Sequence, residues 1–110
     1  MPVPTRSRLS ALVVDLGSQA EVARVLEVDR SRVSRWLKSE EPDAANTLKV
    51  EGTELVLARL LRLYDRQTAI SWLGGFNAHL GGRRPVDLIA GGRLPDVIAA
   101  VDADDAGSYA

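Results

Sequence analysis

The chain has 110 residues, enough for one domain of ordinary size or for two small modules that share a core. With 45% hydrophobic and 26% charged residues it has the composition of a folded soluble protein, and the absence of cysteine excludes disulfides and thiolate metal sites. It has no apolar run long enough to span a membrane and no signal-peptide core at its start, so we expect no membrane partner and a cytoplasmic location.

Charge is unevenly distributed along the chain, although the net charge is only −1. Residues 1–38 carry seven basic and four acidic side chains, which gives this part a net charge of +3. Residues 95–110 carry four aspartates and no basic side chain, which gives a net charge of −4. This polarity predicts a basic surface near the start of the chain and an acidic surface near its end.

Three short helices are predicted in the first part of the chain. Apolar residues recur at helical spacing over residues 7–16. A capping-box pattern at Ser18 opens a second helix that ends at Leu26. Asp29 is expected to cap a third helix that ends at Lys38. The side chains expected on the buried face of this third helix are Val33, Trp36 and Leu37.

The rest of the chain is also predicted to be helical. Residues 39–46 read as an acidic loop, and a long helix follows from Leu48, or at latest from Gly52, to Tyr64. That helix is apolar on most sides, which predicts a central core helix or a dimer interface. No strand pattern and no internal repeat is found, so the predicted fold class is all-α. Further helices are expected at 66–73, 85–90 and 94–102.

The outward face of the third predicted helix is basic, because helical spacing turns Val33 and Trp36 inward. Arginines can form paired hydrogen bonds with guanine edges, and serines and lysines can hold phosphates. The charge pattern alone favours the alternative, a solvated charged face on a packing helix. Together with the helix-helix spacing and the capping box at Ser18, it favours DNA binding by this face. The candidate DNA-binding residues are Arg30, Ser31, Arg32, Ser34, Arg35 and Lys38.

Residues 72–92 hold three Gly-Gly pairs, a proline and an asparagine among large apolar side chains. Glycine pairs are favoured where the backbone reverses with positive φ, so this segment is predicted to turn three times. A disordered linker would not carry so much apolar surface, which indicates a compact knot of short helices and turns. The expected apolar anchors of the knot are Trp72, Leu73, Phe76, Leu80, Val86, Leu88 and Ile89.

This segment resembles the C-terminal toxin-binding domain of the Xre/MbcA/ParS-type antitoxins. The resemblance is carried by the order of Trp72-Leu73, Asn77, Leu80-Gly81-Gly82, Pro85, Asp87-Leu88-Ile89 and Gly91-Gly92. In that family a DNA-binding helix-turn-helix of Xre/Cro type precedes the domain, and residues 18–38 are similar to such a unit. One departure is Glu27, which stands where the family usually has glycine in the turn.

The resemblance implies two parts: a helix-turn-helix that binds promoter DNA in residues 1–46, and a domain in residues 47–110 that dimerises and holds a toxin. The implied partner is a RES-domain toxin, which attacks NAD or uses it to modify a target. The antitoxin would block the toxin's active site and repress its own operon. The candidate toxin-binding residues are Asn77, Gly82, Arg83, Arg84, Asp102, Asp104, Asp105, Ser108 and Tyr109.

The chain shows little sign of chemistry beyond binding. His79 is its one histidine, and without cysteines or a second histidine a metal site or a histidine-based catalytic dyad lacks partners. We expect His79 to form local hydrogen bonds in a turn, and we expect no cofactor, no metal and no enzymatic activity. The alternative to an antitoxin is a free-standing dimeric helix-turn-helix repressor without a toxin partner.

Overall fold

The computed structural model describes residues 3–107, and this part of the chain is almost entirely helical. Within these residues no strand forms, which confirms the predicted all-α class. None of the described helices is long and apolar enough to cross a membrane. The elements are α1 (Thr5–Leu16), α2 (Gln19–Leu26), α3 (Arg30–Lys38), α4 (Ala44–Leu60), α5 (Arg66–Gly74), the 3-10 helix η1 (Ala78–Leu80), α6 (Pro85–Ala90) and α7 (Leu94–Gly107).

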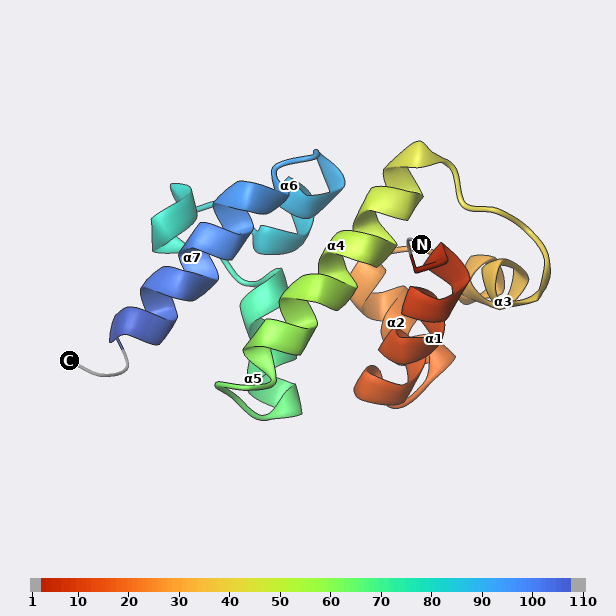
Figure 1. The fold of residues 1–110 in the computed structure, drawn as a ribbon, viewed down its shortest axis with the longest axis horizontal. Coiled ribbons are helices and arrows are strands. Elements are labelled where there is room, and N and C mark those ends of the chain that lie inside the picture. Colours follow the sequence, from red (N-terminus) through yellow and green to blue (C-terminus); the bar gives the residue numbers. More distant parts are fainter. Residues whose placement is uncertain (1–2, 108–110) are drawn as a thin grey trace.

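Helix α4 runs through the middle of the molecule (Figure 1). Helices α1, α2 and α3 lie on one side of it, and α5, α6 and α7 lie on the other (Figure 1). The packing of α4 is most extensive against α1 and α6. The buried residues on both sides belong to one continuous hydrophobic cluster, so the two halves share a core through α4.

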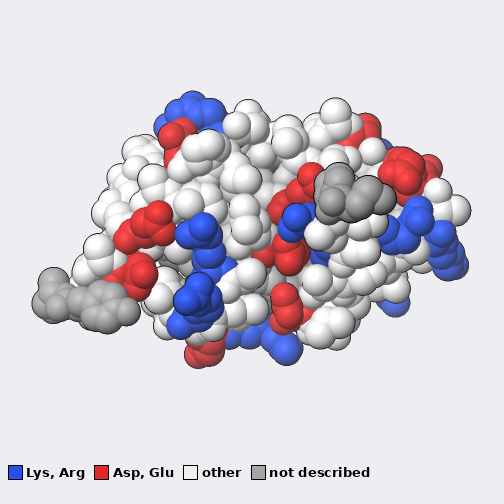
Figure 2. Space-filling view, in the orientation of Figure 1, with Lys and Arg blue, Asp and Glu red and all other residues white. Residues whose placement is uncertain are grey.

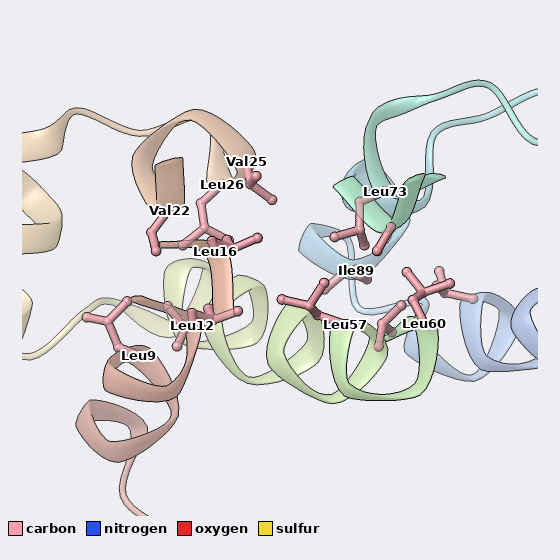
Figure 3. Packing of buried hydrophobic residues seen from close by; sticks show 14 of the residues in the cluster. Leu9, Leu12, Leu16, Val22, Val25, Leu26, Leu57, Leu60, Leu73 and Ile89 are labelled. Atoms are coloured by element: carbon pink, nitrogen blue, oxygen red, sulfur yellow. The ribbon is translucent and has the colours of Figure 1, made fainter. Parts of the chain in front are cut away.

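The core has two groups of side chains that meet along α4 (Figure 3). In one group, leucines of α1 contact apolar side chains of α2, and in the other, leucines of α4 contact α5 and α6. Val50, Val56 and Leu57 of α4 are completely buried, and burying such a side chain contributes roughly 2 kcal/mol. The residues labelled in Figure 3 are Leu9, Leu12, Leu16, Val22, Val25, Leu26, Leu57, Leu60, Leu73 and Ile89.

Both ends of α4 differ from the predicted ones. The predicted loop at 39–46 is too long, because the Asp43 side chain accepts a hydrogen bond from the Asn46 amide at 2.9 Å and starts α4 there. The long helix ends at Leu60 rather than at Tyr64, since the chain turns before the next capping aspartate, Asp65. The residue 46/47 boundary between the two expected parts therefore falls inside α4.

Helix α7 extends further than the sequence predicted. It continues to Gly107, beyond the expected end at residue 102. The residues added to the helix carry two aspartates, Asp104 and Asp105, and neither is fully exposed. The acidic end of the chain is thus helical through its last described residue.

Close contact between α4 and α6 depends on Gly52. A β-carbon at this position would lie 2.5 Å from Cγ2 of Ile89 and 3.5 Å from Cδ1 of Leu94. Gly52 is in the interior of a helix, where glycine costs about 1 kcal/mol relative to alanine. Without a side chain at position 52, α6 can approach α4 closely, and Ile89 can then reach the core.

We predict that Gly52→Ala destabilises the fold by about 1–3 kcal/mol, because the added methyl group overpacks the α4–α6 contact and outweighs the gain in helix propensity. Urea or thermal unfolding followed by circular dichroism measures the change. The matched control is Gly74→Ala in α5, where a β-carbon would meet nothing within 4 Å. Equal stabilisation of both variants would contradict this assignment.

Candidate nucleic-acid and partner interfaces

Helix α3 presents a basic face to solvent at the end of the molecule opposite the C-terminus (Figures 1 and 2). Val33 and Trp36 are buried on its inner side, as the helical spacing predicts, and Leu37 is half-buried. Ser34, predicted to face outward, is half-buried instead. The exposed residues of the predicted DNA-binding set are Arg30, Ser31, Arg32, Arg35 and Lys38.

The C-terminal end of α3 is held by two contacts. Arg6 of α1 donates from Nε to the Trp36 carbonyl at 3.0 Å. Arg35 donates from Nε to Oε2 of Glu40 at 3.1 Å, and both side chains are about half exposed. Since surface ion pairs of this kind contribute about 0–1 kcal/mol, Arg35 can exchange Glu40 for another anion at little cost.

The turn between α2 and α3 has the hydrogen bonds of a Schellman motif, with Glu27 in the position that usually belongs to glycine. The Glu27 amide donates to the Arg24 carbonyl at 3.3 Å, and the Val28 amide donates to the Ala23 carbonyl at 3.0 Å. Glu27 has φ 58° and is the one non-glycine residue with positive φ among residues 3–107. A side chain in this conformation costs roughly 1–2 kcal/mol. Glu27, which stands where the resembled family usually has glycine, therefore adopts the left-handed backbone conformation that glycine accepts more cheaply.

Arg84 joins this turn to the start of α6. Its guanidinium forms a two-pronged contact with Asp87, with Nε to Oδ2 and Nη2 to Oδ1 both at 2.9 Å. The same Nη2 also donates to Oε1 of Glu27. Hydrogen bonding from Arg84 lowers the pKa of the Asp87 carboxyl, and the two carboxylates raise the pKa of Arg84 above its usual value. Arg84, predicted to contact the toxin, is thus already held by two carboxylates of its own chain.

The loop that precedes α6 is a rigid turn built from its own backbone. The Asn77 amide donates to the Arg83 carbonyl at 3.1 Å, and the Gly82 amide donates to the Asn77 carbonyl at 2.8 Å. The Asn77 side chain accepts from the His79 amide at 2.9 Å, so Asn77 organises the loop. Gly82 has φ 80°, a conformation that favours glycine. Arg83 is exposed and donates from Nε to the Leu80 carbonyl at 3.0 Å.

Phe76 does not anchor the knot, contrary to the sequence-based prediction. It is 84% exposed, whereas Leu73 and Leu80 on either side of it are buried. The apolar spacing that placed it in the core cannot register that the chain leaves α5 as extended backbone at Gly75, with φ −91° and ψ 157°. Phe76 is therefore an exposed apolar side chain next to the 77–83 loop.

The carboxylates of α7 contact the body of the protein. Asp102 lies 3.4 Å from Nη1 of Arg59. Asp104 accepts from Nε1 of Trp72 at 2.6 Å, and its other oxygen lies 3.3 Å from Nε2 of His79. The contact between His79 and Asp104 joins residues far apart in the chain, so no local sequence pattern predicts it. Asp105 is half-buried, and Ser108 and Tyr109 lie outside the described residues.

A hollow of about 400 Å³ is lined by both the 77–83 loop and α7. The two segments predicted to bind a toxin therefore lie side by side. Alanines of α7 line the hollow on one side, and the exposed Arg83, Arg93 and His79 also line it. Arg93 is paired with Asp96 at 2.5 Å. Its lining residues are His79, Leu80, Gly81, Arg83, Arg93, Asp96, Ala99, Ala100 and Ala103.

In the described part of the chain, no group of three or more histidine, aspartate or glutamate side chains is placed to hold a metal ion. Comparisons with protein-family models, curated proteins and solved structures found no match to this chain.

We predict that Asp104→Ala destabilises the protein by about 1–3 kcal/mol, because it leaves the half-buried Trp72 indole N–H without its charged acceptor. Chemical unfolding followed by tryptophan fluorescence measures this loss. Asp102→Ala serves as the control: its 3.4 Å ion pair is exposed, so its loss changes stability by less than about 0.5 kcal/mol. Similar losses in both variants would show that Asp104 has no special role in holding α7.

Proposed function

We propose that this protein is an antitoxin that represses its own promoter: α2 and α3 form a helix-turn-helix of Xre/Cro type, and the C-terminal part binds a RES-domain toxin. The observation that supports the DNA-binding half most directly is the outer face of α3. Within Arg30–Lys38 there are four basic side chains and no acidic one, and they are exposed while Val33 and Trp36 are buried. A helix fixed in this way can enter a major groove without rearrangement.

On DNA, the exposed residues of α3 would divide between two tasks. Arg32 and Arg35 lie in the middle of the helix and are placed to reach base edges. Ser31 and Lys38 lie near its ends and suit the flanking phosphates. Asp29 and Glu27 precede the helix and weaken the local positive field, so we expect strong binding to need two copies of the helix on paired half-sites.

The toxin-binding half of the proposal rests on the resemblance to the Xre/MbcA/ParS-type antitoxins and on the joined surface of α7 and the 77–83 loop. Phe76 supplies an exposed aromatic side chain beside this surface, of the kind that often anchors protein interfaces. Arg83 supplies a neighbouring exposed cation. Binding there would bring the end of the chain to the toxin's active site and block it, so the protein would act by occlusion rather than by chemistry.

The apolar surface of α4 that is left for a homodimer is smaller than the sequence predicted. Most of the apolar face of α4 is covered by α1, α6 and α7. Leu48 and Leu55 remain partly exposed, at 48% and 40%, and with Leu94 they line a hollow of about 220 Å³. This patch is where a second copy would contact the chain.

A free-standing repressor without a toxin is the alternative function, and one observation favours it. Asp102 lies beside Arg59, and Asp104 contacts Trp72 and His79, so both carboxylates already have partners within the same chain. A neighbouring reading frame that encodes a RES-type toxin would distinguish the antitoxin from the plain repressor.

We predict that Arg32→Ala with Arg35→Ala weakens binding to the protein's own promoter DNA, since each base-contacting arginine contributes about 1–3 kcal/mol. Both side chains are exposed, so the folded state should be unaffected. Fluorescence anisotropy with the promoter fragment measures affinity. The matched control is Arg62→Ala with Arg66→Ala, which removes the same charge from exposed positions outside α2 and α3. Equal affinities for the two double variants would refute the recognition-helix assignment.

We predict that deletion of residues 108–110 abolishes neutralisation of the toxin encoded beside this gene while the complex still forms. The deletion removes no residue of α7 and keeps Asp104 with its Trp72 contact, unlike a cut at residue 102, so a loss of function would report on the end of the chain itself. Cellular NAD during co-expression and co-purification of the two chains are the measurements. Deletion of residues 1–2 is the control. Full protection by the truncated chain would place inhibition elsewhere, with the 77–83 loop as the first candidate.

A further inference from the structure

The contact between Glu27 and Arg84 is formed at a junction where little else joins the two elements. Glu27 ends α2, and Arg84 precedes α6, 57 residues later in the chain. A hollow of about 170 Å³ lies between them, lined by side chains of α2, α5 and α6. Since apolar packing is incomplete here, the ion pair bridges a gap that side chains do not fill.

Both ends of this ion pair are restrained. Glu27 is held in a left-handed conformation by the Schellman hydrogen bonds at the end of α2. Arg84 is fixed by its two-pronged contact with Asp87 in the first turn of α6. Because the Glu27 backbone and the Arg84 side chain are already held, forming this ion pair costs less conformational entropy than pairing two residues that are both mobile. The ion pair therefore ties the turn after α2 to the start of α6.

We propose that Arg84 is a positioning residue for the DNA-reading helix rather than a contact for the toxin. Through Glu27 it fixes the turn that sets the direction in which α3 leaves α2. The proposal rests on the proposed DNA binding by α3. It also accounts for Glu27 in a turn that favours glycine: the residue whose β-carbon strains the backbone is the one that supplies the carboxylate for Arg84.

Arg83 lies beside Arg84 in the sequence but forms a different contact. It precedes Arg84 directly and is exposed, and its Nε donates to a backbone carbonyl within its own loop. Arg84 is less exposed, at 27% of its side chain, and its donors face the two carboxylates. The two neighbours therefore carry the same charge but different contacts, which makes Arg83 the matched control.

The test compares Arg84→Ala with Arg83→Ala in the full chain, each in the parent background and in a Glu27→Ala background, which removes the acceptor of Arg84. Affinity for the promoter fragment and hydrogen exchange of the Val28 amide are measured for every variant. In the parent background we expect Arg84→Ala to weaken DNA binding by about fivefold or more beyond Arg83→Ala, and to speed exchange at Val28. In the Glu27→Ala background the two arginine variants should become equal in both measurements.

Three results separate the explanations. An Arg84→Ala effect of the same size in both backgrounds overturns the proposal, because Arg84 would then act without Glu27. The same loss of DNA affinity in Asp87→Asn, which keeps the Glu27 contact, also overturns it, since the effect would then arise in α6. If the parent chain does not bind the DNA, the proposed function fails, and exchange at Val28 still decides whether Arg84 positions the turn.

Discussion

The burial of α4 between two groups of helices is the constraint on which the other parts of this structure depend. Val50, Val56, Leu57 and Leu60 are completely buried, and they contact neighbours from both ends of the chain. Because both groups of helices pack on α4, α3 and the 77–83 loop hold fixed positions relative to the same helix. The proposed DNA-binding and partner-binding surfaces can therefore keep a fixed relation without a hinge between them.

The sequence predicted those parts of the fold that local patterns determine. Ser18 caps α2 as its pattern indicated, and the bounds of α3 agree with the prediction because the apolar spacing of Val33 and Trp36 fixes its buried face. The start of α4 was missed because Pro42 and the acidic residues before it resemble a loop, although Asp43 is an N-cap residue type. The extra turns of α7 could not be foreseen, since acidic residues at the end of a helix are locally unfavourable.

The candidate sites were predictable to different degrees for the same reason. The basic face of α3 follows from one helix and its periodicity, so its residues could be chosen from sequence alone. Whether Arg84 is free or paired depends on Glu27, which meets it only in the folded chain. The pairing of Asp104 with Trp72 and His79 and the exposure of Phe76 are likewise products of tertiary structure. The resemblance assigned Arg84 and Asp104 to toxin binding, and the apolar pattern assigned Trp72 and Phe76 to the core. His79 was expected to form hydrogen bonds only within its own turn.

The last turns of α7 carry negative charges at the helix end where negative charge is unfavourable. Asp102, Asp104 and Asp105 gather at the negative end of the helix dipole, and no basic residue lies in the last turn to offset them. Contacts with Arg59, Trp72 and His79 hold this segment in place from outside the helix. Unwinding these turns would relieve the repulsion within the helix while costing few apolar contacts. The end of α7 is thus the segment that a binding surface richer in cations could remodel at the lowest cost to the rest of the fold.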